Sequence, residues 1–241
     1  MKRCLLGLAV VVLGGGVAAA EPAPPNILLI TADDLNCDSV GAFGGKVPGA
    51  TPNIDRLASE GMRFARAHVT VAVCQPCRNA LMTGRYPHRC GGEGFFHLRV
   101  PGVPILPDLL RKAGYTVGIL SKVPHSTPYA NFKWDMVHDN AGLQRNPDAY
   151  AKYTREFLAS AKKQGKPFFL MANANDPHRP FLPTGKGEPK RAKQAQPAAA
   201  SRLFEPSEVV VPGFLPDLPP VREEVAAYFG CVRRCDDTVG A

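Results

Sequence analysis

Residues 26–34 read NILLITADD, a short apolar run that ends in two neighbouring acids. Apolar and polar residues do not alternate over 26–31, which predicts a strand buried on both faces of a sheet. Asp33 and Asp34 follow where this strand ends. Two adjacent carboxylates repel each other unless a cation joins them, so the pair is a candidate cation site. An Asx turn or a helix cap is the alternative interpretation.

Helical and strand patterns alternate along the rest of the chain. Capping residues such as Thr51, early prolines, glycine stops and apolar stripes predict helices over 52–60, 107–113, 147–164 and 221–240. Short apolar runs predict two further strands, over 115–120 and 168–172. Strands that alternate with helices join through right-handed crossovers, so we expect an α/β fold with a mostly parallel sheet flanked by helices.

Polar side chains follow the later strands as well. Lys122 comes after the strand predicted over 115–120, and Asp176 and His178 come after the strand predicted over 168–172. Ligands of parallel sheets bind beyond the carboxyl ends of the strands. This coincidence is the first indication of a functional site.

The composition is that of a globular protein. Hydrophobic residues make up 45% of the 241 residues and charged residues 21%, which excludes a disordered, collagen-like or coiled-coil chain. The net charge of +8 falls to +6 without Lys2 and Arg3, a mild basic excess that predicts no nucleic-acid partner. Residues 183–220 hold eight prolines and a basic cluster, which predict a surface excursion. We favour a solvated loop there over a site for an anionic polymer.

The first twenty residues carry the features of a signal peptide. Lys2 and Arg3 precede an apolar run over 4–17, and three alanines end the segment at 20. The competing interpretation, a membrane anchor, needs about 18 apolar residues, and glycines interrupt this run. We therefore expect a mature chain over 21–241 that is periplasmic or extracellular, or of lysosomal type in a eukaryote, with no membrane attachment.

The most specific string is CQPCR over 74–78, followed by a Thr-Gly pair at 83–84. By itself, Cys-x-x-Cys suggests a redox pair, or half a zinc site completed by Cys231 and Cys235. The second pair is spaced by three residues and histidines at ligand spacing are absent, which disfavours zinc. Six cysteines remain after signal removal, and they allow 15 disulfide patterns among which the sequence does not choose.

The same string resembles the signature of the formylglycine-dependent sulfatases, within the alkaline-phosphatase-like superfamily. The resemblance extends from Asn26 to the last residue. DPHRP at 176–180 and the stretch over 209–240 are most similar to heparan N-sulfatases (sulfamidases) and their bacterial relatives. Cys77 departs from the Ser or Ala usual at its position, and its similar size predicts that it is tolerated.

The resemblance implies a nucleophile and a metal. Cys74 would be oxidised to formylglycine by a formylglycine-generating enzyme, and the aldehyde hydrate would attack sulfur. Arg78 would hold this nucleophile, at a helix amino end that favours an anion. The resemblance also implies that Asp33, Asp34 and residue 74 bind calcium, or else magnesium.

Four further residues acquire roles from the resemblance. Lys122 and His125 would bind the sulfate oxygens and hold the formylglycine hydrate. His178 would contact sulfate or protonate the leaving oxygen or nitrogen, and Arg179 would add a contact to substrate anions. The expected substrate is a sulfated carbohydrate, carrying O- or N-sulfate. The pair 139–140 superficially imitates a second metal pair of the family, but no apolar strand is predicted before it.

The end of the sequence at 241 leads to a further expectation. Family members continue into another strand, a second metal-binding pair and a smaller domain, so we expect an N-terminal sulfatase domain that is incomplete at its C-terminus. Such a chain should bind metal weakly, turn over slowly or not at all alone, and leave a sheet edge exposed. Two alternatives to a sulfatase stay open: a noncatalytic fragment or binding protein with the sulfatase fold, and a Cys-x-x-Cys redox or metal-binding protein.

Overall fold

A parallel four-stranded sheet forms the centre of the molecule. The computed structural model describes residues 23–140, 142–182 and 198–241. The strands are β1 (Ile27–Asp33), β2 (Thr116–Leu120), β3 (Met136–His138) and β4 (Phe168–Pro177). They lie in the order β1-β4-β2-β3, and every pair is parallel. The expected α/β fold with a parallel sheet is confirmed.

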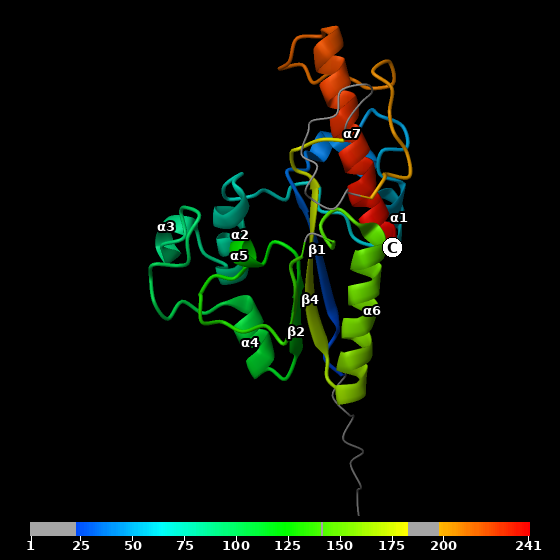
Figure 1. The fold of residues 1–241 in the computed structure, drawn as a ribbon. Coiled ribbons are helices and arrows are strands. Elements are labelled where there is room, and N and C mark those ends of the chain that lie inside the picture. The colour runs from blue at the N-terminus through cyan, green and yellow to red at the C-terminus, as the bar shows by residue number, and fades with distance from the viewer. Residues whose placement is uncertain (1–22, 141, 183–197) are drawn as a thin grey trace, which may run out of the picture.

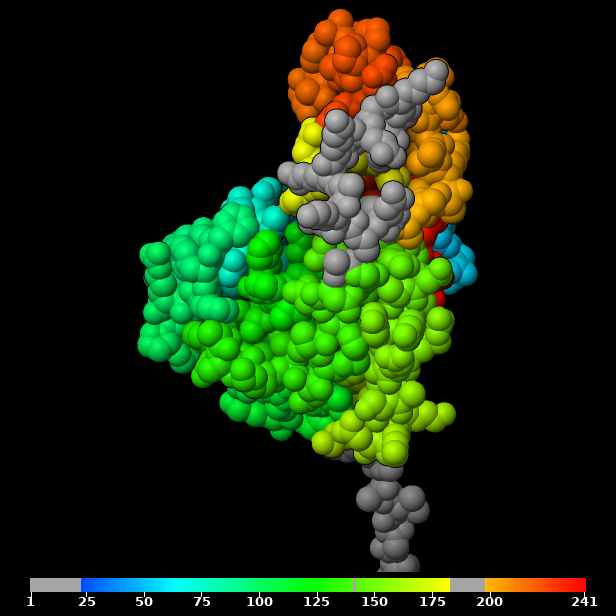
Figure 2. Space-filling view, viewed as in Figure 1, coloured from blue at the N-terminus to red at the C-terminus, as the bar shows by residue number. Residues whose placement is uncertain are grey.

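Helices cover both faces of this sheet. Figure 1 shows α2, α3, α4 and α5 on one side of the strands and α1, α6 and α7 on the other. Their bounds are α1 (Pro52–Glu60), α2 (Cys74–Thr83), α3 (Pro87–Cys90), α4 (Leu106–Lys112), α5 (Val123–Ser126), α6 (Pro147–Gln164) and α7 (Pro219–Gly240). Two short 3-10 turns, η1 (Cys37–Ser39) and η2 (Gly41–Phe43), follow β1. Figure 2 shows the first turns of α7 projecting from the body of the molecule.

Local sequence explains where the longer helices begin and end. The Asn146 side chain accepts a hydrogen bond from Ala149 N at the start of α6, and Gly165 ends the helix with a φ of 63°. Helix α1 begins at Pro52 as expected, but the Thr51 hydroxyl makes no capping bond. Asp236 of α7 caps it instead, accepting hydrogen bonds from Asn53 N and Ile54 N. Tertiary contact therefore replaces the expected local cap.

Two strands differ from their predictions. We expected β1 to be buried on both faces, but it lies at a sheet edge and Leu28 is 47% exposed. No strand was expected before Asp139, yet β3 ends at His138 directly in front of it. Three residues, one of them polar, are too few to give an apolar pattern, and β3 exists because it pairs with Gly118–Leu120 of β2.

Alternate side chains of β2 and β4 enter the cores on opposite faces of the sheet. Val117, Ile119 and Phe169 pack with Met82 of α2 and Trp134. Leu120 and Leu170 face α6, where they pack with Phe157 and Tyr150. At Gly118 an added Cβ would lie 2.7 Å from Phe157 Cε2, so glycine permits α6 to approach the strand closely. These two cores hold the carboxyl ends of the strands in fixed positions.

Several expectations concern segments outside this framework. The signal peptide over 1–20 and the basic cluster within 183–197 lie outside the described residues. Residues 198–218 form turns and irregular backbone, without a helix or strand. Among the described residues, no helix is both long enough and apolar enough to cross a membrane.

Candidate active site

Asp33 lies at the centre of a charged cluster at the carboxyl end of β1. It is 3% exposed; its Oδ1 lies 3.4 Å from Arg78 Nη2, and its Oδ2 forms an ion pair with Lys122 Nζ. Burial alone would raise the pKa of Asp33, but Lys122 and Arg78, with a smaller effect of His178, hold this pKa below its usual range. The carboxylate is therefore ionised at neutral pH.

Lys122 and His125 follow β2, as the sequence predicts. Lys122 has a φ of 53° and precedes α5, which carries His125. The His125 ring lies edge-on to Phe95, with 5.5 Å between centroids, and its buried Nδ1 has no hydrogen-bond partner in the described part of the chain. Burial lowers the pKa of His125 and the Lys122 cation lowers it further, so the imidazole is neutral at pH 7. Asp139, for which the sequence predicted no site role, lies near this pair: burial raises the pKa of its carboxyl, and the backbone N–H groups of Val123 and Lys122 partly offset that rise.

Three side chains, from β1, α5 and β4, accept hydrogen bonds from Arg78. It is 5% exposed, and its Nη1 donates to Thr31 Oγ1 at 3.1 Å, to Ser126 Oγ at 3.3 Å and to Asn173 Oδ1. Asn173 is fully buried in β4, and its Nδ2 donates to Leu120 O and Ser121 O at 3.2 and 2.9 Å. Asn173 was not predicted as a site residue from the sequence, because it directly continues an apolar strand run. An amide inside a buried strand is the signal that could have revealed it.

Cys74 is the first residue of α2, at the end of the helix that favours anions. Burial raises the pKa of the Cys74 thiol, and the Asp33 and Asp34 carboxylates raise it further while Lys122 partly offsets them. Burial also raises the pKa of Cys77. Both thiols therefore stay protonated at neutral pH, which makes them slow nucleophiles in disulfide exchange.

The alternative zinc or disulfide roles of the cysteines find no support in the described residues. All six cysteines there are free thiols. Cys231 and Cys235 are buried in α7, and burial raises the pKa of Cys231 to about 11. Neither belongs to a group of three or more possible metal ligands in the described ranges.

His178 completes the cluster from the segment that ends β4. Its Nε2 lies 3.7 Å from Asp34 Oδ2, and its Nδ1 is 2.6 Å from Arg179 O. Ligand atoms of Asp33, Cys74 and His178 all lie within 4.8 Å of one another. Asp33, Cys74 and His178, which lie far apart in the sequence, thus meet at the carboxyl end of the sheet, where parallel sheets bind their ligands.

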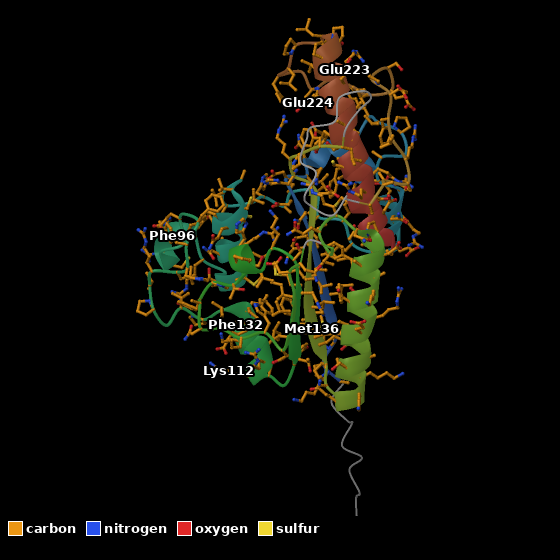
Figure 3. The ribbon with its side chains drawn as sticks, viewed as in Figure 1. Phe96, Lys112, Phe132, Met136, Glu223 and Glu224 are labelled. Atoms are coloured by element: carbon orange, nitrogen blue, oxygen red, sulfur yellow. The ribbon has the colours of Figure 1, made fainter. Side chains whose placement is uncertain are left out.

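Arg179 has a different environment. Its guanidinium forms an ion pair with Glu224 of α7 and lies over the Phe181 ring, 4.4 Å from the centroid. Glu224 lies on the projecting part of α7 (Figure 3). A substrate contact by Arg179 stays a prediction, and it would compete with this ion pair.

The donor set fits a divalent cation. Asp33 Oδ2 is buried and, apart from its ion pair with Lys122, no hydrogen bond reaches it within the described residues. Cys74 Sγ lies within 4.8 Å of the Asp33 carboxylate, and the Asp34 carboxylate, 58% exposed, lies 3.7 Å from His178 Nε2. An oxygen at position 74, in place of sulfur, would suit the hard cations that prefer oxygen ligands.

A cavity of about 740 Å³ opens beside the cluster. It is lined by the end of β1, by segment 68–73 and by the face of α2 that carries Cys74 and Arg78. Its volume lies in the range typical of small-molecule sites. Asp33, Asp34, Cys74 and Arg78 all line this cavity, so an anion that enters it would meet the Arg78 guanidinium at the amino end of α2.

Comparisons with known proteins agree with this geometry. The sulfatase family model matches residues 25–241. N-sulphoglucosamine sulphohydrolase of Homo sapiens is 33% identical over 90% of this chain and 46% of its own length. N-acetylgalactosamine-6-sulfatase of Rattus norvegicus is 40% identical over 45% of this chain and 23% of its own length. The chain spans less than half the length of these curated relatives.

Solved structures share the fold. One protein in complex with its substrate D-glucosamine-2-N,6-O-disulfate is 25% identical, with a TM-score of 0.58 over 66% of this chain and 36% of that chain. A 2-O GAG sulfatase has a TM-score of 0.59 at 20% identity, over 90% of this chain and 53% of that chain. With a family model that matches almost all of the described sequence and a site built from the matching motifs, the chain belongs to the sulfatase family.

Proposed function

We propose that this chain carries the part of a sulfatase active site that contains the nucleophile. The reaction is hydrolysis of O- or N-sulfate on a sugar. One observation supports this most directly: Cys74 begins α2 within 4.8 Å of ligand atoms of Asp33 and His178. Formylglycine at position 74 would place its hydroxyls between the acidic pair and the imidazole. Calcium, or magnesium, bound by Asp33, Asp34 and residue 74 would polarise the sulfate oxygens and favour ionisation of the attacking hydroxyl.

Other side chains of the chain have separate roles in the proposed reaction. Arg78 and Lys122, both beside Asp33, balance the negative charge of sulfate and of the nucleophile. His178 donates a proton to the sugar oxygen or nitrogen as its bond to sulfur breaks. The neutral His125 holds the formylglycine hydrate by a hydrogen bond. The other hydroxyl of residue 74 then re-forms the aldehyde and expels sulfate, which divides one difficult hydrolysis into two steps.

The proposed substrate class is a sulfated glucosamine. The support comes from the relative named for N-sulphoglucosamine and from the neighbour solved with D-glucosamine-2-N,6-O-disulfate. We further propose that the mature chain is exported, with a signal peptide over 1–20 and maturation by a formylglycine-generating enzyme.

A noncatalytic role is the second candidate, and a count of ligands favours it. Calcium takes 6 to 8 oxygen ligands. Of the described residues gathered here, only Asp33, Asp34 and an oxidised residue 74 offer side-chain oxygen ligands. A chain with this ligand set could bind sulfated sugar without hydrolysing it.

The deciding experiment follows residue 74 and then sulfate. The chain is co-expressed with a formylglycine-generating enzyme, and the peptide that contains residue 74 is expected to lose about 18 Da relative to cysteine as the aldehyde forms. Sulfate release from N-sulfoglucosamine and from 6-O-sulfoglucosamine is then measured with calcium present. Cys74→Ala should abolish release, and Cys77→Ala, one helical turn away, is the matched control that should retain it.

The outcomes separate the candidates. An unmodified thiol and no sulfate release would contradict the proposed sulfatase. Conversion without release, together with sugar binding, would favour the noncatalytic role. A disulfide between Cys74 and Cys77 would support redox chemistry instead.

A further inference from the structure

Arg145 lies in the turn before α6 and directs its whole guanidinium at the segment that carries His178. Its side chain is 11% exposed. Nη1 donates to Asp176 Oδ1 at 2.8 Å and to Pro180 O at 2.9 Å, and Nη2 donates to His178 O at 2.6 Å and to Arg179 O at 3.0 Å. One side chain therefore binds the carbonyls of three consecutive residues.

The backbone of Arg145 is specialised for this position. Its φ of 59° lies in the left-handed region, which residues other than glycine seldom adopt. Such conformations persist where surrounding contacts enforce them, and they concentrate at functional sites. Here the enforcing contacts are the hydrogen bonds from the guanidinium to residues 176–180.

Neutralising Asp176 does not explain these contacts. Arg234 already pairs with both oxygens of Asp176, Nε with Oδ2 at 2.6 Å and Nη2 with Oδ1 at 3.0 Å, and both residues are about 1% exposed. The carboxylate would keep this bidentate pair without Arg145. Arg145 and Arg234 together carry one more positive charge than the single Asp176 carboxylate balances. The backbone carbonyls of residues 178–180 accept hydrogen bonds from Arg145 and so stabilise this excess charge.

The His178 segment has few other anchors near the site. His178 N donates to Asn175 O at 3.1 Å, the imidazole Nδ1 lies 2.6 Å from Arg179 O, itself a carbonyl that Arg145 binds, and Nε2 lies 3.7 Å from Asp34 Oδ2. Displacing this backbone by about 1 Å would carry the imidazole away from the reacting atoms, a change that can cost about 100-fold in rate. The position of His178 thus depends on the hydrogen bonds that its own carbonyl and the next two receive.

We propose that Arg145 is the positioning residue for His178: it fixes the proton donor over the site without touching substrate. This inference rests on the proposed sulfatase function. It deepens that function by adding a residue that no local motif of the sequence indicates.

The kinetic test uses the full chain, matured at position 74, with calcium and a sulfated glucosamine. Arg145→Gln should lower kcat by about 10- to 100-fold and change KM by less than about threefold, because it misplaces the proton donor and not the binding groups. Arg145→Lys keeps a cation that donates to the carbonyls, so it should recover part of kcat. Arg155→Gln is the matched control: Arg155 is exposed on α6, has no ion pair within the described ranges, and should leave kcat unchanged.

A second measurement is independent of turnover. Asp34→Asn should shift the NMR resonances of the His178 ring, identified with His178→Gln, because the two side chains are neighbours. In an Arg145→Gln background the same substitution should leave those resonances almost unchanged. Arg145→Lys provides the folded comparison if the glutamine variant does not fold.

The inference would be overturned if folded Arg145→Gln or Arg145→Lys matched the wild-type kcat, or if His178 responded to Asp34→Asn equally in both backgrounds. A wild-type chain that matures but releases no sulfate would contradict the proposed function alone. The NMR comparison would still decide whether Arg145 positions His178.

Discussion

Asp33 carries opposing effects that together set the chemistry of the site. Burial favours its neutral acid, whereas Lys122 and Arg78 favour its carboxylate more strongly. The same carboxylate contributes to the raised pKa of Cys74. A thiol at position 74 is therefore a poor nucleophile beside Asp33, and the proposed aldehyde hydrate, which is neutral, would be better suited to this environment.

The Asp33 pairs predict acid-dependent stability. The folded-state pKa lies below the ordinary value of 3.8, so the stabilisation is complete above that value and is lost as the pH falls through the folded-state pKa. Asp33→Asn should therefore lower the free energy of unfolding at pH 7, and its deficit relative to wild type should shrink below about pH 4. Urea unfolding at a series of pH values measures this. Asp38→Asn, at an exposed position, is the control, and a deficit for Asp33→Asn that stays constant down to pH 3 would contradict the prediction.

At the scale of elements, α7 ties the two ends of the described chain together. Its Asp236 receives hydrogen bonds from Asn53 N at 3.1 Å and Ile54 N at 2.8 Å, and its Tyr228 hydroxyl lies 3.1 Å from Ser39 Oγ. The segment between β1 and α1 is thereby fixed beside Asp33 and Asp34. Helix α7 acts as a support for the site, although none of Asp33, Asp34, Cys74 and His178 belongs to it.

Removing Asp236, the residue of α7 that caps α1, should destabilise the fold. Asp236→Ala leaves two N–H groups at the start of α1 without an acceptor, at a cost of about 1 to 3 kcal/mol in the free energy of unfolding. Glu223→Ala is the control, because Glu223 is exposed near the start of the same helix (Figure 3). The two variants are compared by urea denaturation. Equal stabilities would show that the bonds from Asp236 contribute nothing measurable.

At the scale of the molecule, the sheet leaves β1 at one edge and the short β3 at the other. Among the described residues no further strand pairs with either edge, and Leu28 of β1 is exposed; a further strand or a partner would cover such features. The site lies at the end of β1, next to this edge. The candidate ligands Asp33, Asp34 and Cys74 therefore lie on one side of the site, which would limit how tightly they could hold a cation.

A ligand-poor site predicts a small effect of calcium on stability. With a Kd of about 1 mM, 10 mM calcium would stabilise the folded chain by about 1.4 kcal/mol and raise Tm by about 3 to 6 °C. Thermal unfolding with and without calcium, or magnesium, measures the shift. Asp33→Asn should abolish it, and an equal shift in that variant would place the ion elsewhere.

Much of this protein could be predicted from local sequence. Three of the four strands are short apolar runs, and α6 is bounded by residues that end a helix through their own backbone or side chain. The residues of the candidate site could be singled out because they stand in compact motifs, CQPCR and DPHRP, or directly after strands, and the structure brings most of them together. Periodicity and caps act over a few residues, which is why they can be recognised without a structure.

The tertiary structure alone decided the contacts between distant segments. Asn173 orients Arg78 from 95 residues away, and Arg145 reaches the His178 carbonyl across 33 residues. Asp236 caps a helix that begins 184 residues earlier, and β3 became a strand only by pairing with β2. Each depends on an amide, guanidinium or carboxylate finding a buried partner, and burial is a property of the packed chain rather than of any short stretch within it.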